Sequence, residues 1–308
     1  MRTRADTTET AGGLSGSKRT RAVFEALFVT VLWSSSYVLI KVGLEEIPAV
    51  TFAGLRYGVA TVVLVPLFLR EGGHRSVRRL ERRELAVLLA LGLFMYAITQ
   101  GAQFLALQYL RAATVSLLLT FTPAVVALCS VPLLGERASR RQWLWMVVLF
   151  VGVGVYFYPF DLGVLALVGL GIMAVGLLSN ALASIFGRYA NRDGTLSALA
   201  VTTVSMGVGS ALLLGTGIAV QGLPSLSLRS WAIVLWLAVV NTAFAFTLWN
   251  RTLQTLTATE SSVINNTMLV QVALLGWIFL GESLTLTDGL GMAAVLVGVL
   301  LIQVAGRR

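Results

Sequence analysis

Long apolar runs separated by short polar segments repeat along nearly the whole chain. A helix needs about 20 mainly apolar residues to cross the hydrocarbon core of a bilayer. Runs near that length occupy 22–42, 49–69, 85–107, 112–134, 143–158, 164–187, 196–220, 231–252, 259–280 and 289–305. The pattern therefore predicts an all-α integral membrane protein with ten transmembrane helices. Residues 1–21 are polar and rich in Thr, Gly and Arg, and they are expected to form a disordered cytoplasmic tail.

The chain also contains an internal repeat. Residues 107–153 recur without a gap as residues 253–299, and Leu-Gly-Glu at 134–136 matches Leu-Gly-Glu at 280–282. If each half has five spans, the second half enters the membrane from the opposite side. We therefore expect two inverted five-helix repeats, at 22–158 and 159–308, which can exchange conformations around a central cavity by alternating access.

Composition and charge support a bilayer environment. Hydrophobic residues make up 57% of the chain and charged residues 12%, too few to cover a soluble core. The net charge of +9 resides in short loops, which argues against a nucleic-acid partner. Lys and Arg gather in alternate loops, so both termini are expected to be cytoplasmic. Cys129 and His74 stand alone, so neither a metal site nor another cofactor is expected, and no motif indicates an enzyme.

Polar side chains inside spans are costly in lipid and are the best candidates for a solute pathway. In the third span Tyr96, Gln100 and Gln103 have the spacing i, i+4 and i+7, which places them on one face of an α-helix. The alternative is that they only join helices through hydrogen bonds. The further candidates are Trp33, Ser36, Tyr37, Asn180, Asn241, Ser262 and Asn266. Together they predict a cavity for a small amphipathic or zwitterionic solute.

Two basic residues lie well inside spans, and no Asp or Glu lies in the middle of any span. Lys41 and Arg56 could neutralise a substrate carboxylate. Alternatively, Lys41 extends to the membrane surface and Arg56 contacts helix carbonyls. Without a central carboxylate, proton coupling has no obvious carrier.

Several helix ends and small residues have structural interpretations. In each Leu-Gly-Glu motif, Gly is expected to end the helix and Glu to fix the following loop, with gating by Glu136 and Glu282 as the alternative. Pro123 is expected to kink the fourth helix. Close helix approach is expected at Gly152, Gly154, Gly291 and Gly298.

Particular motifs add a family resemblance. Leu-Trp-Ser-Ser-Ser-Tyr at 32–37 is followed by Lys41, the second span has Leu-Arg-Tyr at 55–57, and the fourth has Pro123 and then Leu-Gly-Glu-Arg at 134–137. With the ten-span pattern, these residues resemble the EamA branch of the drug/metabolite transporter superfamily over nearly all the chain outside the tail.

The resemblance implies a secondary transporter of small organic metabolites in the inner (plasma) membrane. A bundle of this size can act as a monomer or a homodimer. The branch includes exporters of amino acids, among them the YddG type, so an exporter of amino acids or related amphipathic solutes is expected. A metabolite or vitamin importer, or a lipid-handling membrane protein, are the alternatives. No motif singles out the YddG subgroup.

Overall fold

The structure is a computed structural model that describes residues 6–126, 140–159, 163–192, 197–256 and 258–305. Within these ranges every regular element is a helix. The first half contains α1 (Asp6–Gly43), α2 (Ala49–Arg70), α3 (Gly73–Arg78), α4 (Arg82–Leu91), η1 (Gly92–Gln100), α5 (Gly101–Ala106), α6 (Ala112–Thr120) and α8 (Arg140–Tyr156). The second contains α9 (Val164–Arg192), α10 (Ala198–Gln221), α11 (Leu228–Ala238), η2 (Val239–Phe244), α12 (Ala245–Thr252), α13 (Ala258–Asn266), α14 (Met268–Leu280) and α15 (Leu286–Ala305).

The ten predicted spans correspond to apolar helical segments of the structure. Seven are long enough to cross a membrane, and three shorter apolar helices occupy Ala112–Val126, Trp143–Tyr156 and Leu286–Ile302 within the described ranges. The prediction of an all-α membrane protein with two inverted five-helix repeats is confirmed. Part of the fourth predicted span, Cys129 and the first Leu-Gly-Glu motif lie outside the described residues.

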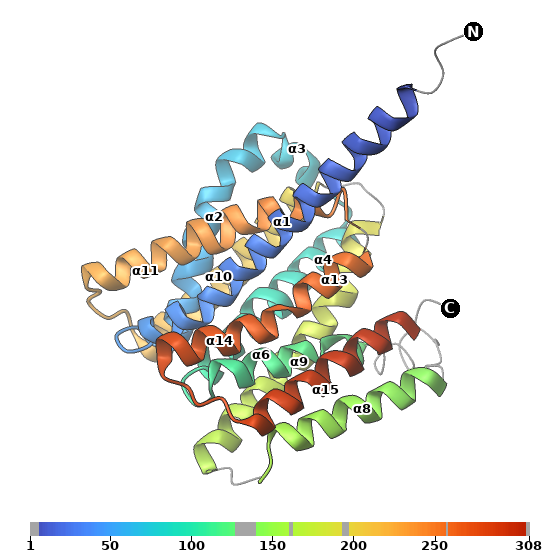
Figure 1. Cartoon of the computed structure of the whole chain (residues 1–308). Coiled ribbons are helices and arrows are strands. Elements are labelled where there is room, and N and C mark those ends of the chain that lie inside the picture. Colours follow the sequence, from blue (N-terminus) through green and yellow to red (C-terminus); the bar gives the residue numbers. More distant parts are fainter. Residues whose placement is uncertain (1–5, 127–139, 160–162, 193–196, 257, 306–308) are drawn as a thin grey trace.

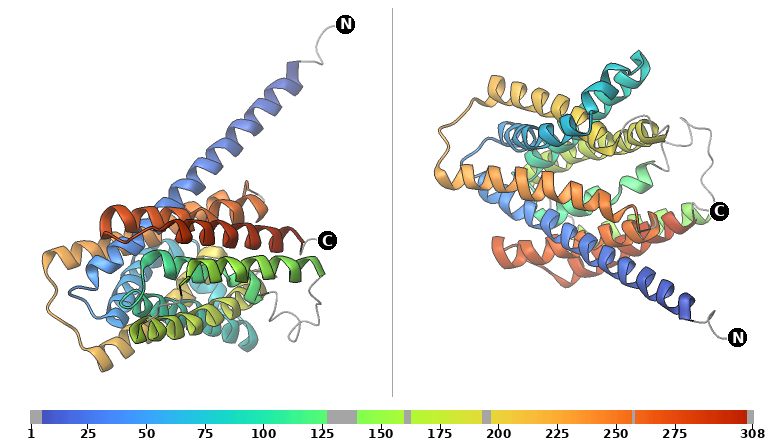
Figure 2. Two further views of the ribbon diagram at one scale, coloured as in Figure 1. Left: turned by 60° about the horizontal axis from the view of Figure 1, so that its bottom comes forward. Right: turned by 90° about the horizontal axis from the view of Figure 1, so that it is seen from above.

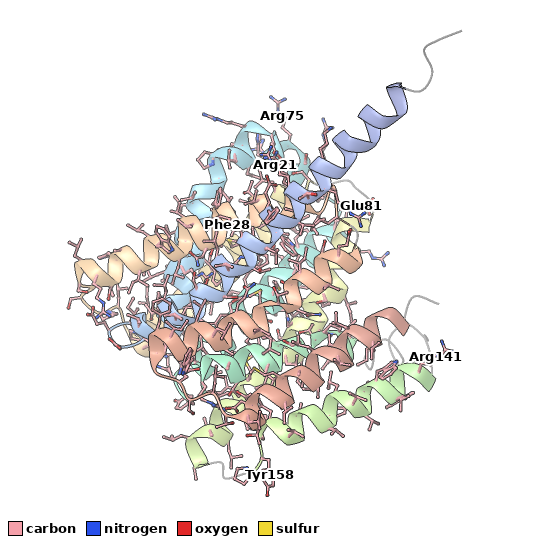
Figure 3. All side chains as sticks on the ribbon, viewed as in Figure 1. Arg21, Phe28, Arg75, Glu81, Arg141 and Tyr158 are labelled. Carbon is pink, nitrogen blue, oxygen red and sulfur yellow. The ribbon has the colours of Figure 1, made fainter. Side chains whose placement is uncertain are left out.

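The outer surface of the bundle is apolar. Phe28 is 51% exposed, Val164 77% and Leu228 87%. A water-soluble protein would bury most such side chains, whereas a bilayer solvates them. Figure 3 shows the labelled Arg21, Arg75, Glu81 and Arg141 toward the end of the bundle at which both chain termini lie. We call this end the terminal end, and the opposite end the loop end.

The first helix is longer than the predicted span. α1 begins at Asp6 and therefore includes most of the segment for which composition predicts disorder. It extends beyond the rest of the bundle in both Figure 1 and Figure 2. No proline interrupts residues 6–21, so the helix continues from the span. Arg19 forms an ion pair with Glu260 of α13, which ties this helix to the second half.

Helices at matching positions of the two halves pack against each other. α2 lies along α10 and α8 lies along α15 (Figure 2). A Cβ atom at Gly291 would lie 2.6 Å from the Tyr156 nitrogen, and one at Gly298 2.9 Å from the Leu149 nitrogen. The predicted close approach therefore occurs at these two glycines and also at Gly152, where a Cβ would lie 2.8 Å from the nitrogen of a residue in α15. At Gly154 the prediction is wrong, because a Cβ there would meet nothing within 4 Å.

The third and eighth spans each contain a π-helical segment, η1 and η2, at corresponding positions of the two repeats. In a π-helix the backbone hydrogen bonds join residues i and i+5 instead of i and i+4. In both segments a threonine hydroxyl group also donates to the carbonyl five residues before it. Thr99 Oγ1 donates to the Phe94 carbonyl at 2.7 Å, and Thr242 Oγ1 donates to the Leu237 carbonyl at 2.8 Å. Segments of this kind are frequent at functional sites. Residues of η1 line the central cavity described next, and so does Phe246 of α12, which follows η2.

Candidate functional site

A cavity of about 420 Å³ lies at the centre of the bundle between the two halves. Its volume is within the usual range for sites that bind small molecules. Helices of both halves line it. The lining residues are Trp33, Ser36, Tyr37, Arg56, Tyr57, Met95, Thr99, Gln100, Gln103, Ser116, Leu119, Thr120, Thr122, Pro123, Asn180, Phe246, Asn265, Asn266 and Met268.

The structure brings most of the predicted site residues together at this cavity. Those that line it are Trp33, Ser36, Tyr37, Arg56, Gln100, Gln103, Asn180 and Asn266. Tyr96, Asn241 and Lys41 lie elsewhere, and the side chain of Ser262 is outside the description, although its backbone belongs to α13. The lining combines aromatic faces with amide and hydroxyl groups, as the sequence predicts.

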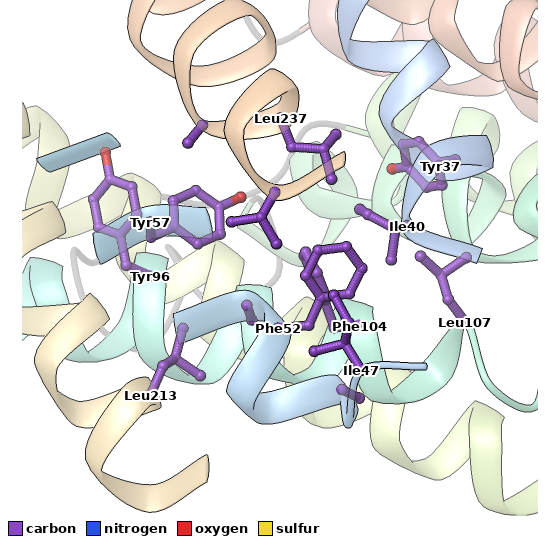
Figure 4. Packing of buried hydrophobic residues seen from close by; sticks show 14 of the residues in the cluster. Tyr37, Ile40, Ile47, Phe52, Tyr57, Tyr96, Phe104, Leu107, Leu213 and Leu237 are labelled. Atoms are coloured by element: carbon purple, nitrogen blue, oxygen red, sulfur yellow. The ribbon is translucent and has the colours of Figure 1, made fainter. Parts of the chain in front are cut away.

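Tyr96 faces α10 instead of the cavity. Its ring is buried and makes an edge contact with the Tyr57 ring, with centroids 5.7 Å apart (Figure 4). The prediction that Tyr96 shares a face with Gln100 and Gln103 assumes α-helical spacing. η1 has more residues per turn, so the i, i+4 and i+7 positions no longer line up.

Asn241 is fully buried behind the cavity wall. Its Nδ2 atom donates to Ser35 Oγ at 3.1 Å, to Ser36 Oγ at 3.0 Å, and to the Leu32 carbonyl. It therefore fixes the eighth span against the first and positions Ser36, which does line the cavity. Asn241 itself is not among the residues that line the cavity.

Arg56 is 5% exposed and reaches the cavity from α2. Its Nε donates to Thr242 Oγ1 at 3.1 Å, and its Nη2 donates to Ser36 Oγ at 3.4 Å. The guanidinium carbon lies 5.1 Å from the centroid of the Tyr57 ring. Neutral groups from α1 and η2 thus hold the cation, and within the described part of the chain no carboxylate pairs with it.

Lys41, in contrast, is neutralised within the protein. Its Nζ lies 3.0 Å from Glu282 Oε1, near the loop end. The same oxygen accepts a 2.7 Å hydrogen bond from the backbone nitrogen of Ala112, which is the first residue of α6. A carboxylate is favourable at a helix N-terminus because that end carries partial positive charge. Lys41 is therefore occupied by the protein and is not available to a solute carboxylate in this structure.

The second Leu-Gly-Glu motif has the structural role that its sequence suggests, and it also joins the two repeats. Gly281 ends α14 with a left-handed conformation, φ 65°. Glu282 then bonds α1 and α6, both in the first half. The equivalent Glu136 lies outside the described residues.

A second ionic contact lies beside the first. Arg111 donates from Nη2 to Asp288 Oδ1 at 2.9 Å and from Nη1 to Asp288 Oδ2 at 3.1 Å, in a bidentate arrangement. Nη1 also donates to the Ser283 carbonyl at 2.8 Å. The Asp288 carboxylate raises the pKa of Arg111 further above its ordinary value. We call the two contacts, Lys41–Glu282–Ala112 and Arg111–Asp288, the loop-end latch.

Polar capping between the halves continues along the loop end. Gln221 Oε1, at the end of α10, accepts from the Val50 nitrogen at 2.9 Å in the first turn of α2. Glu46 accepts from both Ser227 Oγ and Ser230 Oγ at 2.6 Å. These hydrogen bonds lower the pKa of Glu46 below its ordinary value. At this end, acceptors from the second half thus cap the N-termini of α2 and α6.

Sequence reasoning did not single out several lining residues. They are Tyr57, Met95, Thr99, Ser116, Leu119, Thr120, Thr122, Phe246 and Met268. Isolated Ser and Thr residues are common on buried faces of membrane helices, so nothing in their spacing marks them as cavity residues. Ser116 had one available signal, its match to Ser262 in the repeat. Pro123, noted as a possible kink, also lines the cavity, and so does Asn265, which belongs to the dense polar group of the ninth predicted span.

Two repeats, an apolar exterior and a cavity between the halves define a polytopic membrane protein with a transporter fold. The model of the EamA-like transporter family matches residues 20–158 and 167–304, one copy in each half. The chain belongs to this family.

Relatives named as transporters match most of the chain. The uncharacterized transporter YoaV of Bacillus subtilis is 24% identical, covering 88% of this chain and 92% of YoaV. The uncharacterized inner membrane transporter YedA of Escherichia coli K12 is 25% identical, covering 91% of this chain and 90% of YedA. A crystal structure with a TM-score of 0.64 and 19% identity covers 94% of this chain and 99% of its own, and it supports the fold alone.

Proposed function

We propose that this chain is an inner-membrane secondary transporter that exports amino acids or related amphipathic solutes by alternating access. One observation carries the proposal: the central cavity is lined by both halves and combines aromatic rings with neutral hydrogen-bonding groups. The aromatic faces suit the apolar part of a solute, and the amides suit its polar part. The outward direction is supported by the resemblance to a branch that includes exporters.

The loop-end latch supports alternating access. Its ionic contacts and the helix caps beside it all join one half to the other at the same end of the bundle. We infer that this structure corresponds to a state closed at the loop end. Transport requires these contacts to break so that the cavity opens there.

The basic residues support the orientation. Exposed arginines follow α2 at the terminal end, including Arg75, Arg78 and Arg79, whereas the loop end carries Glu45 and Glu46. By the positive-inside rule the terminal end is cytoplasmic and the loop end faces outward. In this orientation, a chain closed at the loop end cannot release solute outward until the latch opens.

The test is counterflow in proteoliposomes that contain the purified protein. Labelled amino acids and other small metabolites are offered with and without an imposed pH gradient. We expect saturable counterflow of at least one amphipathic solute. Silence across the panel, from protein shown to be folded by thermal unfolding, contradicts the transport function.

A matched pair of variants links flux to the cavity. Gln100→Ala removes a lining amide, and one hydrogen bond is worth about 0.5–1.5 kcal/mol, so transport should fall about 2- to 10-fold. Gln254→Ala removes the same side chain at an exposed position and should leave flux unchanged. Equal flux in both variants removes Gln100 from the site.

A further inference from the structure

Arg56 keeps its positive charge inside the bundle. A guanidinium group does not lose its proton under ordinary conditions. Arg56 lies seven residues into α2, about 10 Å along the helix from its start. Its side chain is too well buried to extend to water, since the residue is only 5% exposed. The cavity therefore contains a fixed cation.

Among the described residues, no carboxylate pairs with this cation. Thr242 and Ser36, its hydrogen-bond partners, are neutral, and so is the Tyr57 ring beside it. The sequence has no Asp or Glu in the middle of any span. A buried charge without a counter-charge is costly, so an anion that enters the cavity gains a strong interaction.

The carboxylates near the ends of neighbouring helices are already engaged. Glu282 pairs with Lys41, Glu25 with Arg21, and Glu260 with Arg19. Because Lys41 pairs with Glu282 and does not line the cavity, it adds no second cation to the cavity. The cavity lining thus carries one positive charge and, within the described residues, no negative charge.

We propose that the cavity binds organic monocarboxylates, with the carboxylate at Arg56 and the apolar part on the aromatic rings, and that it prefers them to zwitterions and cations. This proposal rests on the transport function, and within its substrate class it favours amphipathic carboxylates without an ammonium group over the amino acids themselves. The free Nη1 side of Arg56 can donate to a carboxylate while Thr242 and Ser36 hold the other side of the group. Among the described lining side chains, a solute ammonium group would find aromatic rings and neutral amide and hydroxyl oxygens but no carboxylate, so it would lose hydration without gaining an ion pair.

Three probes with the same phenyl group separate these classes. They are 3-phenylpropionate, which is an anion, phenylalanine, which is its zwitterionic 2-amino derivative, and phenethylamine, which is a cation. Binding to the purified protein is measured by calorimetry near neutral pH, and counterflow is measured in proteoliposomes. Both carboxylates can reach Arg56, so these two probes differ in the ammonium group of phenylalanine, which loses its hydration without an ion pair. Leaving a buried polar group unpaired costs about 1–3 kcal/mol, so we expect 3-phenylpropionate to bind on the order of 10- to 100-fold more tightly than phenylalanine.

Variants assign the preference to Arg56. Arg56→Gln should abolish the preference for the anion, while Arg56→Lys, which keeps the charge but not the planar fork, should retain part of it. Arg75→Gln makes the same charge change at an exposed position after α2 and should leave the preference intact (Figure 3). Thermal unfolding of each variant shows whether it folds. If Arg56→Gln does not fold, the probe comparison in the unaltered protein and in Arg56→Lys decides.

The possible results separate this proposal from the broader one. Binding of phenylalanine or phenethylamine as tight as that of 3-phenylpropionate overturns the monocarboxylate proposal, and so does an unchanged preference in Arg56→Gln. If 3-phenylpropionate, benzoate and indole-3-acetate all fail to bind while another solute shows saturable counterflow, the carboxylate proposal fails and the transport function stands. If no solute shows counterflow, the transport function fails as well.

Discussion

Replacing Glu282 by Gln should open the loop end of the bundle. Glu282 is nearly buried, with 8% of its side chain exposed, and its partner Lys41 is 23% exposed. The amide of Gln can still accept from the Ala112 nitrogen, but the ion pair with Lys41 and the charge at the α6 N-terminus are lost. These losses leave Lys41 without its counter-charge.

The size of the effect follows from these contacts. Removing one partner of a largely buried, charge-assisted pair costs about 2–3 kcal/mol. If the pair exists only in the state closed at the loop end, the ratio of closed to open molecules falls by about 30- to 150-fold, because each 1.36 kcal/mol is a factor of ten.

A cysteine in the cavity reports the opening. In a chain carrying Cys129→Ala and Ser116→Cys, the new thiol lines the cavity and can be labelled by a charged, membrane-impermeant maleimide added at the loop-end side. Glu282→Gln should accelerate labelling by up to the factor of about 30 to 150 by which the ratio of closed to open molecules falls.

Glu45→Gln is the matched control. It makes the same chemical change in a pair with Arg229 that is 3.7 Å long and exposed on both sides, 61% and 65%. Exposed pairs contribute little, so labelling should stay at the parent rate. Equal labelling rates in Glu282→Gln, Glu45→Gln and the parent would refute the assignment of a latch to Glu282.

Three further changes test other parts of the structure. A double-mutant cycle of Arg111→Lys and Asp288→Asn should show a coupling of about 1 kcal/mol in thermal unfolding, reduced by solvent screening because Arg111 is 34% exposed; additive effects contradict the bidentate contact. Gly209→Ala should destabilise the protein by about 2 kcal/mol, because the new Cβ lies 2.5 Å from a carbonyl oxygen of η1, whereas Gly171→Ala meets nothing within 4 Å and should not destabilise it; similar melting temperatures in the two variants contradict this packing. The folded-state pKa of Glu46 is lowered, so its stabilising contribution is present above its ordinary pKa of 4.5 and is lost as pH falls through the lower folded value; Glu46→Gln should flatten the acid side of the melting profile, and an unchanged slope argues against the two serine hydrogen bonds.

Hydrophobic pattern predicts the spans well because lipid imposes one requirement on every segment that crosses it. A run of apolar residues must be helical and about as long as the bilayer is thick. The internal repeat shows how the two halves are related, because a match that continues without a gap through the loops aligns spans of one half with spans of the other. These two signals are enough for the fold class, and most of the predicted site residues lie at the cavity because polar side chains in lipid gather where helices meet.

The side chains that sequence misplaced depend on contacts between distant segments or on helix geometry. Nothing in the third span signals a π-helix, yet η1 turns Tyr96 away from Gln100. The sequence places Lys41 inside a span, but Lys41 forms an ion pair with Glu282, which lies far along the chain in the other half. Neither fact follows from spacing within one helix. Of the two basic residues predicted inside spans, Arg56 is the one without a carboxylate partner in the described structure.

The two repeats share a backbone plan, but their charges differ, and that difference affects the two ends of the bundle unequally. Under the repeat match Arg111 corresponds to Thr257, and Asp288 corresponds to Gln142. The bidentate ion pair of the loop end therefore cannot be reproduced by the equivalent positions at the terminal end. Symmetry lets either end close, whereas the extra pair stabilises closure at the loop end. For an exporter in the proposed orientation, such a bias keeps the cavity closed to the outside until solute from the cytoplasm has bound.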